Sequence, residues 1–249
     1  MTPEQLLFTQ GFGSRKMCAS LVADGALTVN GSVITDNNIT LTITAPDFNF
    51  EVEGANQTPP WPYREKAYVM LNKPLNFECS QKPKSHPSVY NLLANPLRTR
   101  TGGGLQSVGR LDHDTTGLLL FSDDGQFIHK MSSPKHHVPK VYDVTISEPI
   151  SDEQIQKLLA GVVLADDPAP VRALACTRMD APNKIHMTLA QGKYHQVKRM
   201  MAAVKSHVDA LHRSQIGALK IPADLALGEW CWLSADELAL AKLKTSSAA

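Results

Sequence analysis

Short apolar stretches separated by turn-forming residues predict that strands and helices alternate along this chain. Residues 118–121 are four consecutive apolar side chains, preceded by a T-T-G segment that is expected to be a turn and followed by a serine-aspartate-aspartate-glycine turn. A run of this length with these flanks is typical of a buried strand. Further strands are predicted over residues 68–71 and 141–146, and over 185–189, where apolar and polar positions alternate.

Helices are predicted where polar capping residues precede an apolar pattern of helical period. Capping boxes at residues 151–154 and 234–237 each predict a helix start, and Gly161 ends the first of these helices. From His195 to residue 205, apolar side chains recur at helical spacing with basic residues between them. Strands mixed irregularly with helices favour an α+β fold over a doubly wound one.

The N-terminal segment has a pattern of its own. Ser14 is placed to cap a helix that runs to about Asp24, and the Asn30-Gly31 pair predicts a β-hairpin with a type I′ turn. Residues 41–43 read as a further short strand. The apolar side chains expected on the buried side of the helix are Met17, Cys18, Leu21 and Val22.

A polar, proline-rich stretch separates this segment from the rest of the chain. The sequence GANQTPPWP at residues 54–62 has the composition of a linker. We therefore expect a small module over residues 1–55, a linker over 56–63, and a larger domain over 64–249.

Charge is distributed unevenly between the two parts, although the net charge is only +1. Residues 1–55 carry two basic and six acidic side chains, whereas the remainder carries 23 basic and 18 acidic ones. If the partner is a polyanion, the larger part must provide most of the attraction.

Composition excludes several classes of protein. Hydrophobic residues make up 43% and charged residues 20%, which is the balance of a globular protein. The four cysteines are far apart, so neither a zinc site nor a disulfide scaffold is expected. No apolar stretch has the length of a membrane span, and no signal peptide is apparent at the start. We expect a cytoplasmic protein that does not contact a membrane.

Three clusters of polar residues are candidates for chemistry, at 109–114, 135–142 and 192–199. The first places Asp112 just before the buried strand, where a carboxylate is held rigidly and partly desolvated. The other two are basic with an interleaved tyrosine, a mixture that binds phosphates by charge and bases by stacking. Taken one at a time, each also fits a plain structural role as a turn, a solvated loop or a helix face.

Two stretches of the sequence approximate known ligand-binding motifs but do not match them. Residues 112–123 approximate a calcium loop, but the ninth position is Leu120, which cannot be a ligand. The glycines at 102–104 lack the G-K-[ST] ending of a phosphate loop, so a flexible loop is the simpler interpretation. No metal site is expected.

The three clusters, in this order, resemble the motifs of pseudouridine synthases of the RsuA type. G-R-L-D-H-D-T-T-G-L-L-L-F-S-D-D-G resembles the catalytic motif of that family, and M-L-N-K-P its upstream strand. S-P-K-H-H-V-P-K-V-Y resembles the second motif, and G-K-Y-H-Q-V-K-R-M-M with L-H-R-S-Q-I-G the third. The N-terminal G-x-S-R-K and V-N-G resemble an S4 RNA-binding domain, although Glu4-Gln5-Leu6-Leu7 replaces its basic opening. A small packing domain that only orients the enzyme remains the alternative for this module.

The resemblance implies an α+β fold in which a mixed, mainly antiparallel sheet is flanked by helices. It also implies roles for five residues. Asp112 is the catalytic aspartate, acting as nucleophile or base, and Lys198 balances its charge. Tyr142 stacks on the uracil and serves in proton transfer, and Leu211 forms a wall of the pocket. Arg110 fills the gap left when the target base is flipped out of its stack.

The remaining implications concern partners. The expected partner is ribosomal RNA in a small-subunit assembly intermediate, bound by a monomer, and the redox-neutral isomerisation needs no cofactor. A large-subunit RNA target and a non-catalytic RNA-binding assembly factor stay open as alternatives. Besides Arg110 and Leu211, the residues expected to bind RNA are Lys135, His136, Lys140, Lys193, His195, Arg199, Arg15 and Lys16.

Overall fold

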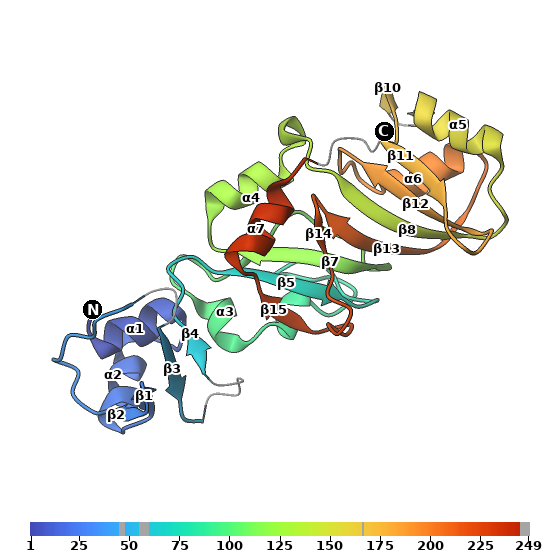
Figure 1. The fold of residues 1–249 in the computed structure, drawn as a ribbon. Helices are drawn as coiled ribbons and strands as arrows, with labels where there is room; N and C mark the ends of the chain where they lie inside the picture. Colours follow the sequence, from blue (N-terminus) through green and yellow to red (C-terminus); the bar gives the residue numbers. More distant parts are fainter. Residues whose placement is uncertain (45–47, 55–59, 166, 245–249) are drawn as a thin grey trace.

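An elongated molecule results, with a small N-terminal module at one end and a long, twisted sheet extending away from it (Figure 1). The computed structural model describes residues 1–44, 48–54, 60–165 and 167–244. None of the helices in these ranges is both long enough and apolar enough to cross a membrane.

The N-terminal module packs two helices against a four-stranded sheet in the order β2-β1-β3-β4. The predicted cap is present, because the Ser14 hydroxyl accepts a hydrogen bond from the Met17 amide at 3.3 Å. The predicted hairpin is also present, with Asn30 and Gly31 both at positive φ. Its elements are α1 (Pro3–Gln10), α2 (Arg15–Ala23), β1 (Leu27–Val29), β2 (Ser32–Ile34), β3 (Asn49–Val52) and β4 (Trp61–Pro62).

Three details of this module differ from expectation. Met17 is 53% exposed, whereas Cys18 and Val22 of the same helix are fully buried. Residues 41–43 are not a strand; Leu41 instead exchanges two backbone hydrogen bonds with Met1. Trp61, expected in the linker, is buried and pairs with β3. The linker residues 55–59 lie outside the described ranges.

A nine-stranded mixed sheet forms the larger part, and its main path runs β11-β12-β8-β13-β7-β5-β15. Among the described residues, the strand pairings within it are antiparallel except that of β13 with β7, so the predicted α+β architecture is confirmed. Its strands are β5 (Tyr68–Lys73), β6 (Gln106–Ser107), β7 (Thr115–Ser122), β8 (Lys140–Ile146), β11 (Ala175–Arg178), β12 (Lys184–Leu189), β13 (Val208–Ile216), β14 (Leu219–Lys220) and β15 (Trp230–Trp232).

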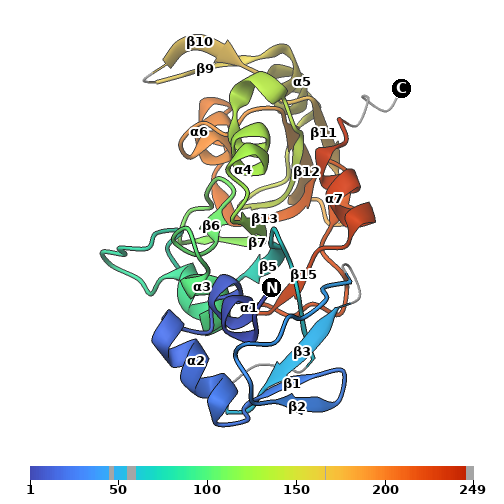
Figure 2. The ribbon, with the colours of Figure 1, turned by 90° about the vertical axis from the view of Figure 1, so that its left-hand side faces the viewer.

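Helices flank this sheet, and a separate hairpin projects from its far end (Figure 2). Both predicted capping boxes form, at Ser151 and at Ser234. The hairpin consists of β9 (Val162–Leu164) and β10 (Asp167–Val171). The helices are η1 (Val89–Leu92), α3 (Asn95–Thr99), α4 (Gly125–Ser132), η2 (Pro134–His136), α5 (Asp152–Ala160), α6 (Gln196–Ala203) and α7 (Ala235–Lys242).

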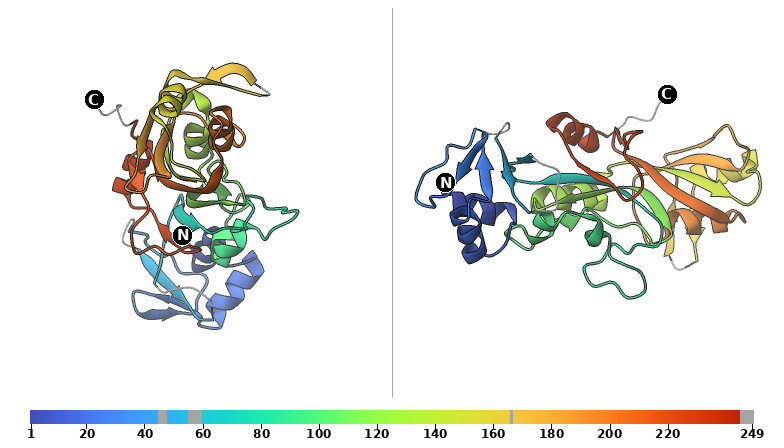
Figure 3. Two further views of the ribbon diagram at one scale, coloured as in Figure 1. Left: turned by 90° about the vertical axis from the view of Figure 1, so that its right-hand side faces the viewer. Right: turned by 90° about the horizontal axis from the view of Figure 1, so that it is seen from below.

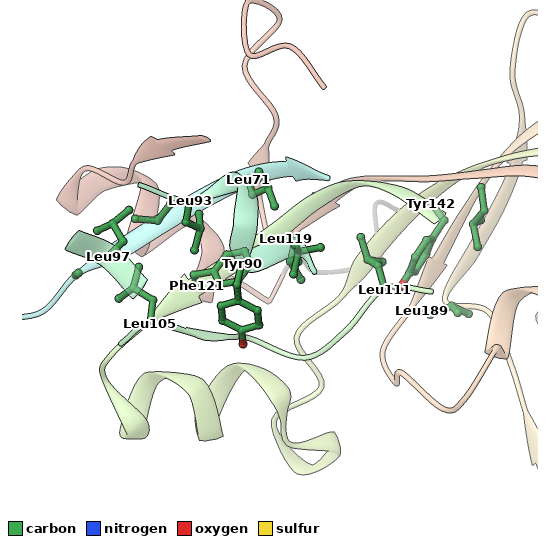
Figure 4. Packing of buried hydrophobic residues seen from close by; sticks show 14 of the residues in the cluster. Leu71, Tyr90, Leu93, Leu97, Leu105, Leu111, Leu119, Phe121, Tyr142 and Leu189 are labelled. Atoms are coloured by element: carbon green, nitrogen blue, oxygen red, sulfur yellow. The ribbon is translucent and has the colours of Figure 1, made fainter. Parts of the chain in front are cut away.

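Strand β7 is buried on both faces, which explains its uninterrupted apolar run. Leu119 and Phe121 enter one buried cluster (Figure 4), whereas Leu118 and Leu120 enter another. The T-T-G segment, expected as a turn, is the first part of this strand. Gly117 has φ +106°, and a Cβ there would lie 2.4 Å from the carbonyl oxygen of Arg213. Only glycine, which has no Cβ, leaves room for the backbone of β13 at this position.

A buried arginine ties the two parts together. The Arg100 guanidinium donates to Asp123 at 2.8 Å, to the Gln10 side chain at 2.9 Å and to the Arg64 carbonyl at 2.7 Å. Gln10 belongs to α1 and Asp123 follows β7, so one guanidinium bridges the N-terminal module and the large sheet. The Thr99 hydroxyl adds a hydrogen bond to the Gly11 carbonyl at 2.6 Å.

Candidate active site

A cavity of about 250 Å³ opens where the loop before β7, the strands β8 and β13, and the start of α6 meet. The loop, β8 and α6 carry residues of the three sequence clusters, and β13 carries the L-H-R-S-Q-I-G motif. The residues of the five assigned roles all line it: Arg110, Asp112, Tyr142, Lys198 and Leu211.

The loop that carries Asp112 is held by hydrogen bonds from Lys73, the last residue of β5. The Lys73 side chain is fully buried, and its ammonium donates to the carbonyls of Pro74 at 3.0 Å, His113 at 3.2 Å and Thr115 at 2.8 Å. Burial lowers the pKa of Lys73 to about 8. The carbonyls of His113 and Thr115 lie one and three positions after Asp112, so this ammonium fixes the loop.

The Asp112 carboxylate faces the cavity beside a histidine. His195 Nε2 lies 3.3 Å from Asp112 Oδ1, and the Asp112 side chain is 27% exposed. His195 is the residue just before α6 and adopts a left-handed conformation with φ 47°. This strained residue brings the imidazole to the carboxylate.

Lys198 lies in the cavity wall but pairs with a different carboxylate from the one expected. Its ammonium donates to both oxygens of Asp114, at 2.5 and 2.6 Å. Burial disfavours the ionised carboxylate, but the hydrogen bonds and charge of Lys198 outweigh it and lower the pKa of Asp114. Lys198 thus forms its ion pair with Asp114, two positions after Asp112, and its role in balancing the charge of Asp112 stays a prediction.

Tyr142 and Leu211 come from neighbouring strands. In the antiparallel pairing of β8 with β13, Tyr142 lies opposite Arg213 and Leu211 lies opposite Val144. Tyr142 is 8% exposed and belongs to the same buried cluster as Leu111 and Leu189 (Figure 4). The cavity thus has a carboxylate at its edge and an aromatic ring in its wall.

The sequence model of the family described as RNA pseudouridylate synthase matches residues 67–203, more than half of the chain. The chain belongs to the RNA pseudouridylate synthase family.

Relatives match almost the whole length. The ribosomal small subunit pseudouridine synthase A of Escherichia coli (strain K12) is 36% identical over 229 residues, which cover 91% of this chain and 93% of that protein. The protein of the same name from Yersinia pestis is 37% identical over 226 residues, covering 91% and 92%. A crystal structure of a pseudouridylate synthase matches with a TM-score of 0.66 and 30% identity over 97% of this chain and 99% of that one.

The basic residues expected to bind RNA fall into two groups in this pseudouridylate synthase. Lys140, Lys193 and His195 line the cavity. Lys193 is paired with Asp167 from β10. The other group lies outside the cavity lining: Lys135 and His136 in η2, Arg199 in α6, and Arg15 and Lys16 in α2.

The N-terminal basic residues are exposed, and one of them is already engaged. The Arg15 guanidinium lies 3.1 Å from the Glu4 carboxylate and 4.4 Å from the centroid of the Phe8 ring. Lys16, next to it, is also exposed. The ion pair neutralises half of the positive charge that the sequence places at the start of α2.

Arg213 at the cavity had no predicted role, and Tyr194 was singled out only as the interleaved tyrosine of the 192–199 cluster. Arg213 is 3% exposed and lines the cavity; its Nε donates to the Leu118 carbonyl at 2.8 Å, while its buried Nη2 has no hydrogen-bond partner among the described residues. Tyr194 is 69% exposed, and its ring stacks on His195 with centroids 3.8 Å apart. The period-two alternation of β13 was a usable signal for Arg213, because it places residue 213 on the same face as Leu211.

Proposed function

We propose that this chain isomerises one specific uridine of small-subunit ribosomal RNA to pseudouridine, with Asp112 as the catalytic residue. The observation that carries the proposal is the cavity in which Asp112 faces Tyr142, Leu211 and several cations. The names of the full-length relatives support the choice of RNA.

The target base must leave its stack before Asp112 can act, because the glycosidic bond is otherwise inaccessible. Tyr142 offers its ring to the uracil, and Leu211 limits the pocket beside it. Arg110 is exposed at the mouth of the cavity, where it can enter the space that the flipped base leaves. Asp112 then attacks the nucleotide or removes a sugar proton, and either role uses the same carboxylate.

Positive charge in the cavity that holds Asp112 comes from Arg213, whose partly unpartnered guanidinium lines it. We assign the balance of the Asp112 charge to this guanidinium, which is always protonated. His195 adjoins the carboxylate at 3.3 Å. Lys198 contributes through its ion pair with Asp114.

Lys140 gives RNA binding a pH dependence. Burial lowers the pKa of Lys140 to about 8, and the charge of Arg213 is a second, smaller cause of this shift. The ammonium is therefore charged at pH 7 and loses its charge as pH rises through 8. We expect RNA affinity to fall about fivefold from pH 7 to pH 9 in the wild type. The Lys140→Arg variant keeps its charge throughout, so its fall should be smaller; equal falls in both proteins would remove Lys140 from the phosphate contacts.

In our proposal the N-terminal module, residues 1–55, is an S4-like RNA-binding unit. It orients the catalytic domain, residues 64–249, on the RNA. The burial of Trp61 and the Arg100 bridge support a fixed orientation. Arg15 and Lys16 are its phosphate contacts, of which Lys16 is the more available.

Mapping pseudouridines across all ribosomal RNA in cells with and without this protein tests the function. We expect one site in small-subunit RNA to disappear. Loss of a large-subunit site would redirect the proposal to that RNA, and an unchanged map would leave a non-catalytic assembly factor.

We further propose that a monomer acts in the cytoplasm on an assembly intermediate. Activity on naked RNA, partial particles and mature subunits, compared in vitro, distinguishes these substrates.

A further inference from the structure

A basic loop beside the catalytic aspartate took no part in the site described above. We propose that this loop, residues 79–87, is an RNA-contacting arm that binds phosphates of the strand adjoining the target uridine. The proposal rests on the proposed function, since it takes the RNA to be the molecule that delivers a nucleotide to Asp112.

The 79–87 loop has a defined conformation. The Glu78 carboxylate accepts hydrogen bonds from three successive backbone amides, those of Lys84 at 3.0 Å, Ser85 at 2.7 Å and His86 at 2.9 Å. These bonds lower the pKa of Glu78 to about 2. The Ser88 hydroxyl closes the neck of the loop by donating to the Ser80 carbonyl at 2.5 Å. The acidic group is thereby occupied by the loop's own backbone.

The base of the loop is attached to the segment that carries Asp112. The rings of His86 and His113 stack with centroids 4.4 Å apart and an interplanar angle of 16°. The Leu111 amide donates to Cys79 Sγ at 3.4 Å. Leu111 and His113 are the two chain neighbours of Asp112, so the loop and the catalytic carboxylate are held together on both sides.

The two lysines of this loop are exposed, and no ion pair neutralises their charges among the described residues. Lys82 and Lys84 are exposed, and within the described ranges neither has a carboxylate at ion-pair distance. In contrast, Lys193 and Lys198 at the cavity are each paired with an aspartate. Free ammonium groups next to a nucleotide pocket attract phosphates.

The position of the loop suits a strand that leaves the cavity. Figure 2 shows a long loop, in the teal and green of residues 75–90, projecting between α2 and α6, and the right-hand view of Figure 3 places all three on one side of the molecule. Lys84 precedes His86 by two positions, so their Cα atoms are at most ~7 Å apart. The lysines therefore lie within reach of nucleotides next to one held at Asp112.

The double variant Lys82→Ala/Lys84→Ala tests the arm. We expect its dissociation constant for a ribosomal RNA fragment to rise about tenfold at 0.1 M salt, and the slope of log affinity against log salt to fall by about 1.4. Its single-turnover rate at saturating RNA should stay within about twofold of the wild type. The matched control is Lys220→Ala/Lys244→Ala, which removes two exposed lysines that lie outside the loop and the cavity lining and should leave both affinity and slope unchanged.

Wild-type affinity and slope in the loop variant would overturn the proposal, as would an equal loss in the control. A loss seen only with protein-containing ribosomal particles, and not with naked RNA, would also overturn it, because the loop would then contact a ribosomal protein. If the wild type binds the RNA but forms no pseudouridine, the proposed function fails, while the comparison of affinities still decides the role of the loop.

Discussion

The Asp112→Asn variant is expected to lose pseudouridine formation by at least about 10³-fold, equivalent to about 4 kcal/mol of transition-state stabilisation. Asparagine keeps the size of the side chain but supplies neither an anionic nucleophile nor a base. RNA affinity should change by no more than about twofold, because phosphate contacts provide most of it. Single-turnover conversion of a ribosomal RNA fragment, with binding measured in parallel, checks both expectations.

Asp114→Asn is the informative comparison, since it changes a carboxylate only two residues away. Asp114 holds Lys198 through two short hydrogen bonds, so its loss should lower the rate by about tenfold and leave chemistry measurable. Loss of all activity in Asp114→Asn together with an active Asp112→Asn would reverse the roles that we assign to the two carboxylates.

The Lys73→Met variant is expected to lower the free energy of unfolding by about 2–4 kcal/mol, because three carbonyls lose the buried ammonium that they share as a donor. Methionine fills a similar volume, so the loss reports the hydrogen bonds rather than a cavity. The catalytic rate should fall as well, since the His113 and Thr115 carbonyls that Lys73 holds belong to the Asp112 loop. Urea denaturation and single-turnover rates measure the two effects.

Lys66→Met serves as the control for Lys73. Lys66 is exposed on the same segment of chain, and removal of an exposed side chain should change stability by no more than about 0.5 kcal/mol. A Lys73→Met protein that unfolds at the wild-type urea concentration and keeps its rate would show that the three hydrogen bonds do not position the loop.

Elements with a strong local signal were predicted well. The caps at Ser14, Ser151 and Ser234 form as expected, because a cap is decided by a hydroxyl and an amide only three residues apart. The hairpin at Asn30-Gly31 is equally local. Strand β7 was predicted from its apolar run, since a strand buried on both faces has no polar alternation to obscure it.

Errors arose where distant segments decide the outcome. The T-T-G segment looked like a turn, but β13 passes against Gly117 and makes it part of a strand. Residues 41–43 had strand composition, yet the N-terminal residue took their backbone hydrogen bonds. Trp61 lay in a proline-rich stretch, and its packing against the tryptophans of β15 could not be read from that composition.

The sequence by itself determined the α+β class, the order of the motifs and the resemblance that identified Asp112, because these depend on residue types and short spacings. Only the tertiary structure decided which side chains contact Asp112 and Asp114. Helix α6 enters the cavity after a left-handed residue, so His195 reaches Asp112 while Lys198, one turn further, reaches Asp114. Ion pairing depends on distances of a few ångströms between segments more than eighty residues apart, and no local pattern encodes such distances.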